Sequence, residues 1–351
     1  MESPLTPNKE QKENKGENLE RKLVQEDEEE KKEIISHKNQ SQHQDPILYY
    51  NQGLSFRNAG EEESALVSFT KAIQLNPDFS AAYLGKGLAL SALGQKDPAI
   101  TFYNKAIDLQ PDFFDAHYNK GTTLSALGQK EAAIASFDKA IKLKPDDINV
   151  YNEKGAALYK LGQYKPSSLC YDKIIQLNPD HYAAYYNKGM ALSALGEFEE
   201  AVLCFDKGIR LKSDNASIHY NKGVILYRLD RKEEAISCYN KAIDLQPNNA
   251  IFYYNRGLAL SSLNQKEAAL ISYNKAIELK SDNADFYYDQ GVTLSALGHK
   301  KPAVFSFNKA IELKPNCAKS YIEKGAILYD LGEFEASRSC YEKAKYLQRY
   351  K

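Results

Sequence analysis

Apolar residues recur along most of the chain in two helix-length sets that are separated by one glycine. In a representative stretch the first set is spaced by three residues and consists of Tyr118, Gly121, Leu124 and Leu127. Gly128 then ends the helix, because glycine adopts the left-handed conformation without strain. The second set also has helical spacing and consists of Ala133, Ile134, Phe137, Ala140, Ile141 and Leu143. The pattern predicts two helices joined by a tight turn, a helical hairpin.

This hairpin pattern repeats every 34 residues. One glycine marks the period, at Gly53, Gly87, Gly121, Gly155, Gly189, Gly223, Gly257, Gly291 and Gly325. We number each repeat from seven residues before that glycine, which then occupies position 8. The nine repeats start at Pro46, Ser80, Phe114, Ile148, Tyr182, Ala216, Ala250, Ala284 and Ala318. A tandem array of this kind predicts an all-α solenoid over residues 46–351, in which each hairpin buries its apolar face by stacking on its neighbours.

Other positions of the repeat refine the hairpin. Pro98, Pro166 and Pro302 all occupy position 19, where proline is tolerated only if the second helix has just begun. They therefore predict a start of the second helix at positions 17 to 19. Glycine at position 8 lies inside the first helix, where it costs about 1 kcal/mol relative to alanine. Together with the small residue at position 20, it predicts a close approach of the two helices beside the aromatic ring at position 24.

These residues resemble the tetratricopeptide repeat family, in period and in the residue types at positions 8, 20, 24, 27 and 32. The resemblance covers Pro46 to the C-terminus and implies a right-handed superhelical solenoid of nine helix-turn-helix repeats. The sequence departs from the family at position 4, which holds tyrosine or histidine in place of tryptophan. The fourth repeat is the least regular. We expect its large Ile174 to be compensated by the small Gly208 at the same position of the fifth repeat.

The two ends of the chain differ from the regular repeats. Residues 1–45 hold eight Lys and Arg against twelve Asp and Glu, a net charge of −4, and contain no aromatic residue. We expect this charged tail to be disordered. In the ninth repeat Arg338 and Lys345 replace residues that are mostly apolar at positions 21 and 28 of the other repeats. We therefore expect those positions to face the following repeat and the ninth repeat to act as its own cap.

Composition and charge argue against several classes of function. The net charge of −1 provides no general attraction for nucleic acid or anionic membranes. Neither a secretion signal nor a membrane-length apolar segment is found in the sequence. Four of the five cysteines, Cys170, Cys204, Cys238 and Cys340, occupy equivalent repeat positions, which favours packing over disulfides or metal ligation. We expect a cytoplasmic protein with no nucleic-acid, membrane or small-molecule partner.

No pattern of catalytic residues is found. The recurring Gly-x6-Gly stretch, for example from Gly87, lacks the Gly-Lys-Ser/Thr end of a phosphate-binding loop. The six histidines are scattered and form no ligand pair at helical spacing. We therefore expect no enzymatic activity, no cofactor and no metal site.

The candidate site is the face of the first helices that carries positions 2, 5, 6, 9, 12 and 13, which we call the first-helix face. In the tetratricopeptide family this face lines a concave groove that binds peptides or partner helices. Here position 5 is tyrosine in six repeats and position 6 is asparagine in five: Tyr50, Asn51, Tyr118, Asn119, Tyr186, Asn187, Tyr220, Asn221, Tyr254, Asn255 and Tyr288. An asparagine amide both donates to and accepts from a peptide backbone, and tyrosine offers a rigid surface with a polar tip.

Two interpretations of these columns stay open. In the first interpretation, the asparagine and tyrosine columns bind an extended ligand. In the second, they form hydrogen bonds and packing contacts with neighbouring repeats. Our main hypothesis is a non-catalytic scaffold that binds other proteins or peptides in the groove. The alternatives are a recruiting or regulatory subunit of an enzyme complex, for example in glycosyl transfer, and a chaperone adaptor. The adaptor is disfavoured because Lys319 alone is basic in the columns that clamp a carboxylate in such proteins.

Overall fold

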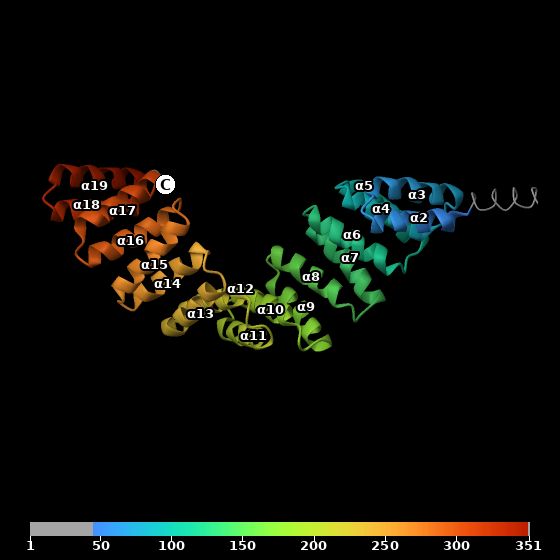
Figure 1. The fold of residues 1–351 in the computed structure, drawn as a ribbon, viewed down its shortest axis with the longest axis horizontal. Coiled ribbons are helices and arrows are strands. Elements are labelled where there is room, and N and C mark those ends of the chain that lie inside the picture. The colour runs from blue at the N-terminus through green and yellow to red at the C-terminus, as the bar shows by residue number, and fades with distance from the viewer. Residues whose placement is uncertain (1–44, 350–351) are drawn as a thin grey trace, which may run out of the picture. The chain divides into compact units, whose positions relative to one another are not determined.

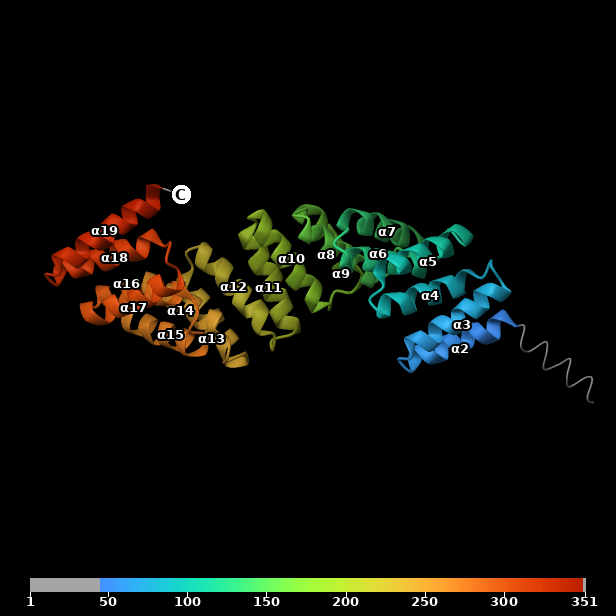
Figure 2. The same ribbon diagram turned by 90° about the horizontal axis from the view of Figure 1, so that it is seen from above.

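The computed structural model describes residues 45–349, and α-helices are the only regular secondary structure in that range. Each repeat contributes two helices in chain order (Figures 1 and 2). The helices are α2 (Pro46–Asn58), α3 (Glu62–Leu75), α4 (Ser80–Ala92), α5 (Lys96–Leu109), α6 (Phe114–Ala126), α7 (Lys130–Leu143), α8 (Ile148–Lys160), α9 (Tyr164–Leu177), α10 (Tyr182–Leu195), α11 (Phe198–Leu211), α12 (Ala216–Arg228), α13 (Lys232–Leu245), α14 (Ala250–Ser262), α15 (Lys266–Leu279), α16 (Ala284–Ala296), α17 (Lys300–Leu313), α18 (Ala318–Asp330) and α19 (Phe334–Arg349).

The prediction of an all-α solenoid of helical hairpins is confirmed. Every second helix begins at position 17 of its repeat, inside the range that the prolines indicate. The expected tail lies outside the described residues, except for Asp45. This aspartate is the N-cap of α2, because its Oδ1 accepts a hydrogen bond of 2.8 Å from the backbone N–H of Ile47.

The chain divides into two compact units, Met1–Val150 and Tyr151–Lys351. In the first unit, the hairpins α2–α3, α4–α5 and α6–α7 stack in order, with α3 on α4 and α5 on α6. In the second unit the same order runs from α9 to α19, with each second helix packed on the first helix of the next repeat. Each unit therefore builds its core locally, from neighbouring hairpins.

The interior of each hairpin explains the glycine at position 8. A Cβ atom added to Gly257 would lie 2.6 Å from Cε1 of Tyr273, the position-24 ring of the same repeat. Ala269 at position 20 is fully buried beside that ring. Since the ring occupies the space that a side chain at position 8 needs, the glycine is required for the close approach of the two helices.

The turn within each hairpin uses the left-handed conformation at position 15. Seven repeats place glycine there, with φ between 74° and 83°. The sixth and seventh repeats place Asp230 and Asn264 there instead, each with φ of 60°. Aspartate and asparagine are the residues other than glycine that adopt this conformation most readily, so the turn keeps its geometry in all nine repeats.

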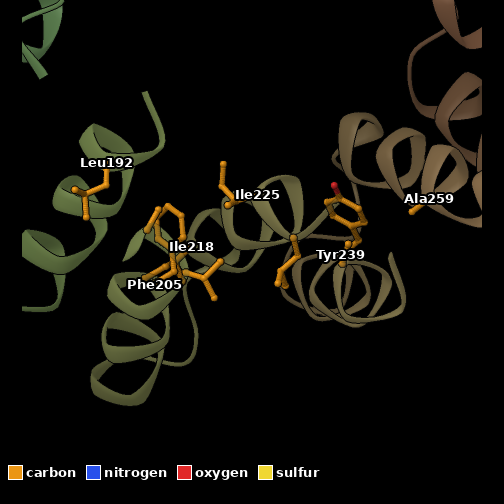
Figure 3. Close-up of a cluster of buried hydrophobic side chains, with 10 residues drawn as sticks. Leu192, Phe205, Ile218, Ile225, Tyr239 and Ala259 are labelled. Carbon is orange, nitrogen blue, oxygen red and sulfur yellow. The ribbon is translucent and has the colours of Figure 1, made fainter. Parts of the chain in front are cut away.

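Stacking between repeats depends on positions 21 and 28 of the second helices, as expected. Leu66 of the first repeat packs on the cluster of Leu84 and Tyr103 in the second. Figure 3 shows a cluster from the fifth to the seventh repeat, in which Leu192, Phe205, Ile218, Ile225, Tyr239 and Ala259 are labelled. In the ninth repeat the substituted Arg338 and Lys345 are exposed.

We expected the small Gly208 to compensate for the large Ile174, but the side chain that Gly208 accommodates is a different one. A Cβ atom on Gly208 would lie 2.5 Å from Cδ1 of Ile218, at position 3 of the next repeat. Gly208 therefore accommodates Ile218 across the interface between the fifth and sixth repeats. Size is compensated between position 27 of one repeat and position 3 of the following one.

Candidate functional site

The position-5 tyrosines are packing residues as well as surface residues. All six are half-buried, and each ring contacts the position-24 ring of its own hairpin, with centroids 5.8 to 6.3 Å apart. The contacts are Tyr50–Phe69, Tyr118–Phe137, Tyr186–Phe205, Tyr220–Tyr239, Tyr254–Tyr273 and Tyr288–Phe307. Aromatic pairs at this separation stabilise a fold beyond the area that they bury.

Some of these rings also reach the following repeat. Tyr220 lies 4.9 Å from Phe252, and Tyr254 lies 4.7 Å from Phe286, measured between ring centroids. Both phenylalanines occupy position 3 of the next first helix and are buried. These two position-5 rings therefore contact the second helix of their own repeat and the first helix of the next one.

Two position-6 asparagines of the second unit bond to the preceding repeat. The Nδ2 atom of Asn221 donates to the hydroxyl of Tyr186 over 3.0 Å, and that of Asn255 donates to the hydroxyl of Tyr220 over 3.3 Å. Burial raises the pKa of both tyrosines, and the amide donor lowers it in part. The two columns thus form a ladder of side-chain bonds between successive repeats.

The eighth repeat continues this ladder with a carboxylate. The hydroxyl of Tyr254 donates to Oδ2 of Asp289 over 2.7 Å. Burial raises the pKa of the Asp289 carboxyl, although the tyrosine donor and the nearby Lys319 oppose the change. Sequence analysis missed Asp289 as a member of the site, and its place at position 6 is the signal that identifies it.

The remaining asparagines of the column do not bond to another repeat. Asn119 donates to the backbone carbonyl of Asp115 in its own helix over 2.7 Å, and Asn51 is exposed. Asn187 is half-buried, and its side-chain amide makes no hydrogen bond to any described residue. The column therefore contains inter-repeat contacts at some positions and amides that are available to a ligand at others.

A pocket of about 290 Å³ opens on the first-helix face between the fourth and fifth repeats. Its lining includes Asn152, Tyr159, Tyr171, Tyr186, Asn187 and Met190. Two of these residues, Tyr186 and Asn187, belong to the predicted site. Asn152, Met190 and Tyr159 lie at positions 5, 9 and 12 of the first-helix face, and Tyr171 lies at position 24. The pocket therefore reaches from the first-helix face to the interior of the fourth hairpin.

Three further observations concern other kinds of site in the described part of the chain. Between residues 45 and 349, histidine, cysteine and acidic side chains do not gather in groups of three or more that would suit a metal ion. None of the described helices has both the length and the apolar character needed to cross a membrane. Lys319, the single basic residue in the columns of the disfavoured carboxylate clamp, lies over the ring of Tyr288, with its Nζ atom 4.0 Å from the ring centroid.

Models of the tetratricopeptide repeat match nearly the whole described chain. Models described as tetratricopeptide repeat match residues 47–79, 80–113, 102–135, 148–181, 170–202, 216–249, 238–271, 284–317 and 318–350, and one described as TPR repeat matches 121–162, 189–230 and 259–298. The chain belongs to the tetratricopeptide repeat family, which confirms the resemblance found in its sequence. Among curated proteins, none matches it.

Solved structures with similar backbones are numerous. A tetratricopeptide repeat protein from Parabacteroides merdae is 17% identical, with a TM-score of 0.51, and the match covers 71% of this chain and 98% of that one. The hetero-tetramer Cut9–Hcn1 of the APC/C is 17% identical over 76% of this chain and 52% of that one, with a TM-score of 0.50. These two matches show the shared fold.

A third structure is YrrB, described as a TPR protein with an unusual peptide-binding site. It is 28% identical over 56% of this chain and 97% of its own, with a TM-score of 0.48.

Proposed function

We propose that this protein is a non-catalytic module that binds segments of other proteins on its first-helix face. The observation that supports this most directly is the set of asparagine amides on that face. Asn221 and Asn255 use one or both amide N–H groups within the protein, and no described residue donates to their Oδ1 atoms. A peptide backbone offers N–H groups at regular intervals, which such oxygens accept without reading the side chains of the ligand.

The tyrosine column supports the same proposal in a different way. Each position-5 ring is held between two or three helices, so its conformation is fixed before a ligand arrives. A surface whose side chains are already ordered loses little conformational entropy on binding. We therefore propose that the inter-repeat ladder preorganises the face for its ligand, and that packing and binding roles coexist in the same columns.

The proposal includes a cytoplasmic location. Cys204, Cys238, Cys317 and Cys340 are free thiols, and burial raises the thiol pKa of Cys204, Cys238 and Cys340. A raised pKa keeps a thiol protonated and unreactive, which suits a packing role. Repeated packing cysteines without disulfides are typical of proteins in reducing compartments.

The experiment that tests the proposal is a quantitative pull-down with mass spectrometry. The variant carries alanine at Asn119, Asn187, Asn221 and Asn255 together. A matched control carries alanine at four exposed asparagines of the second helices, Asn104, Asn240, Asn274 and Asn308. Circular dichroism first establishes that both variants keep the helix content of the wild type.

We expect a set of partners to be lost from the first variant and retained by the control. The physical reason is that the first set removes amides from the proposed binding face, whereas the second removes as many from elsewhere. Equal partner lists for both variants would show that the first-helix asparagines act only in packing, and would refute the proposal.

A further inference from the structure

The fourth repeat differs from the other eight at position 5, because its side chain there is a polar amide. The fourth repeat has Asn152 there, whereas six repeats have tyrosine and the other two have the apolar Leu84 and Ile322. A short amide cannot reach as far as a tyrosine ring. The pocket of about 290 Å³ on the first-helix face is lined by Asn152 itself and by Tyr171, the position-24 residue of the same hairpin.

The lining of this pocket matches the surroundings of a position-5 tyrosine elsewhere. In the sixth repeat, the ring of Tyr220 packs on Tyr239 at position 24, and its hydroxyl accepts from Asn255 at position 6 of the next repeat. The equivalent residues around the pocket are Tyr171 and Asn187, and both line it. The pocket thus has both residues that a position-5 tyrosine contacts elsewhere, the ring of Tyr171 and the amide of Asn187, but no tyrosine between them.

The hydrogen bonds of the asparagine column support this comparison. Asn221 and Asn255 each follow a repeat with a position-5 tyrosine, and each donates to its hydroxyl. Asn187 follows the repeat that has Asn152, and its side-chain amide makes no hydrogen bond within residues 45–349. A half-buried amide in this state is satisfied by water or by a ligand.

The remaining walls suit an aromatic guest. Tyr171 is almost fully buried and forms a fixed surface. Met190, at position 9 of the fifth repeat, provides a flexible apolar wall, and such side chains adapt to the shape of a guest. An apolar cavity of about 150 Å³ already accepts a benzene ring, so a pocket of 290 Å³ has room for one aromatic side chain.

We propose that this pocket receives one aromatic side chain of a bound polypeptide, and prefers tyrosine to phenylalanine. The guest ring packs against Tyr171, and its hydroxyl accepts a hydrogen bond from the Nδ2 atom of Asn187. The inference rests on the proposed function, since it assigns an anchor point to a ligand of the first-helix face. The repeats with their own tyrosine serve as internal examples of the filled state.

The test uses the full-length chain and the substitution Asn152→Tyr, which fills the pocket with the residue that six repeats already have. This variant is expected to fold, and thermal unfolding checks that it does. The matched control is Asn308→Tyr, the same change at an exposed site on α17. The probe is a library of random dodecapeptides displayed on phage and selected on the wild type.

We expect the selected peptides to share tyrosine or phenylalanine at one position. Their affinity should fall about thirtyfold or more in Asn152→Tyr, as for loss of a central aromatic anchor, and stay unchanged in Asn308→Tyr. A tyrosine peptide should bind the wild type more tightly than its phenylalanine analogue. That difference should disappear in Asn187→Ala, because the hydroxyl then has no donor to pair with.

The outcomes separate this inference from the proposed function. Peptides that bind Asn152→Tyr as tightly as the wild type, yet lose affinity in the four-asparagine variant, would overturn the anchor pocket and leave the binding face in place. If no peptide is selected, or if the selected peptides are insensitive to the four-asparagine variant as well, both the proposed function and the inference are wrong.

Discussion

Tyr254 and Asp289 show how a single residue changes the ladder between repeats. The hydroxyls of Tyr186 and Tyr220 accept from asparagines, whereas that of Tyr254 donates to a carboxylate that is partly removed from water. Burial disfavours the charged form of this carboxylate, and its pKa is raised. A carboxyl with a raised pKa in the folded state binds its proton more tightly there than in the unfolded chain. The fold therefore gains stability as the pH falls through that pKa.

The substitution Asp289→Asn should stabilise the protein at neutral pH by a few tenths to about 1 kcal/mol, because it removes a partly buried charge and keeps a hydrogen bond to Tyr254. Urea unfolding, followed by circular dichroism, measures the effect. The difference from the wild type should shrink as the pH is lowered, since the wild-type carboxyl then becomes neutral. A difference that is constant with pH, or a destabilised variant at neutral pH, would contradict this description of Asp289.

At the scale of the secondary-structure elements, the turn at position 15 sets how the two helices of a hairpin meet. Glycine adopts the required positive φ without strain, whereas Asn264 and Asp230 adopt it at some cost. Space is not a constraint here, because a Cβ atom at the equivalent Gly298 would meet no atom within 4 Å. The difference between these residues is therefore a difference in backbone energy.

We predict that Asn264→Gly raises the urea midpoint of unfolding, by an amount that corresponds to a few tenths to about 1 kcal/mol. Gly298→Ala should lower it by about 1 kcal/mol, because alanine is strained at positive φ and gains no contact there. The two variants are matched, since they exchange residues at the same position of neighbouring repeats. Midpoints that move in the same direction would contradict the argument from backbone conformation.

Most of the elements could be predicted from the sequence because each repeats nine times. The period, the position-19 prolines and the position-15 glycines locate both helices of every hairpin, and the structure confirms them. The partner of Gly208 was not predictable in this way. Its compensation by Ile218 crosses a repeat boundary, and spacing along one helix says little about which side chains meet across an interface.

At the scale of the whole molecule, the columns of the candidate site were visible in the sequence, but their bonding was not. The link between Asn221 and Tyr186 joins residues 35 positions apart, and it depends on how two hairpins stack. The pocket beside Asn187 was missed although its signal is a single residue, Asn152, at a position that is otherwise aromatic or apolar. Departures from a repeat are thus as informative as the repeat itself.

A second set of side chains competes with the first-helix face for the role of binding site. Position 22 of the second helices carries large apolar side chains that are 58% to 72% exposed in five repeats. They are Val67, Leu169, Leu203, Ile271 and Phe305. Large apolar side chains that are exposed can mark a contact with another protein, so position 22 and the first-helix face must be distinguished by experiment.

The most direct measurement is photo-crosslinking from one position on each surface. A benzophenone amino acid replaces Ala194, which is exposed at position 13 on α10, or Leu203, which is exposed at position 22 on α11. Both sites belong to the fifth repeat, so that fold and expression are matched. The proposed function predicts polypeptide adducts from position 194 that disappear in the four-asparagine variant, and few adducts from position 203. Adducts mainly from position 203, or adducts at 194 that persist in that variant, would contradict binding on the first-helix face.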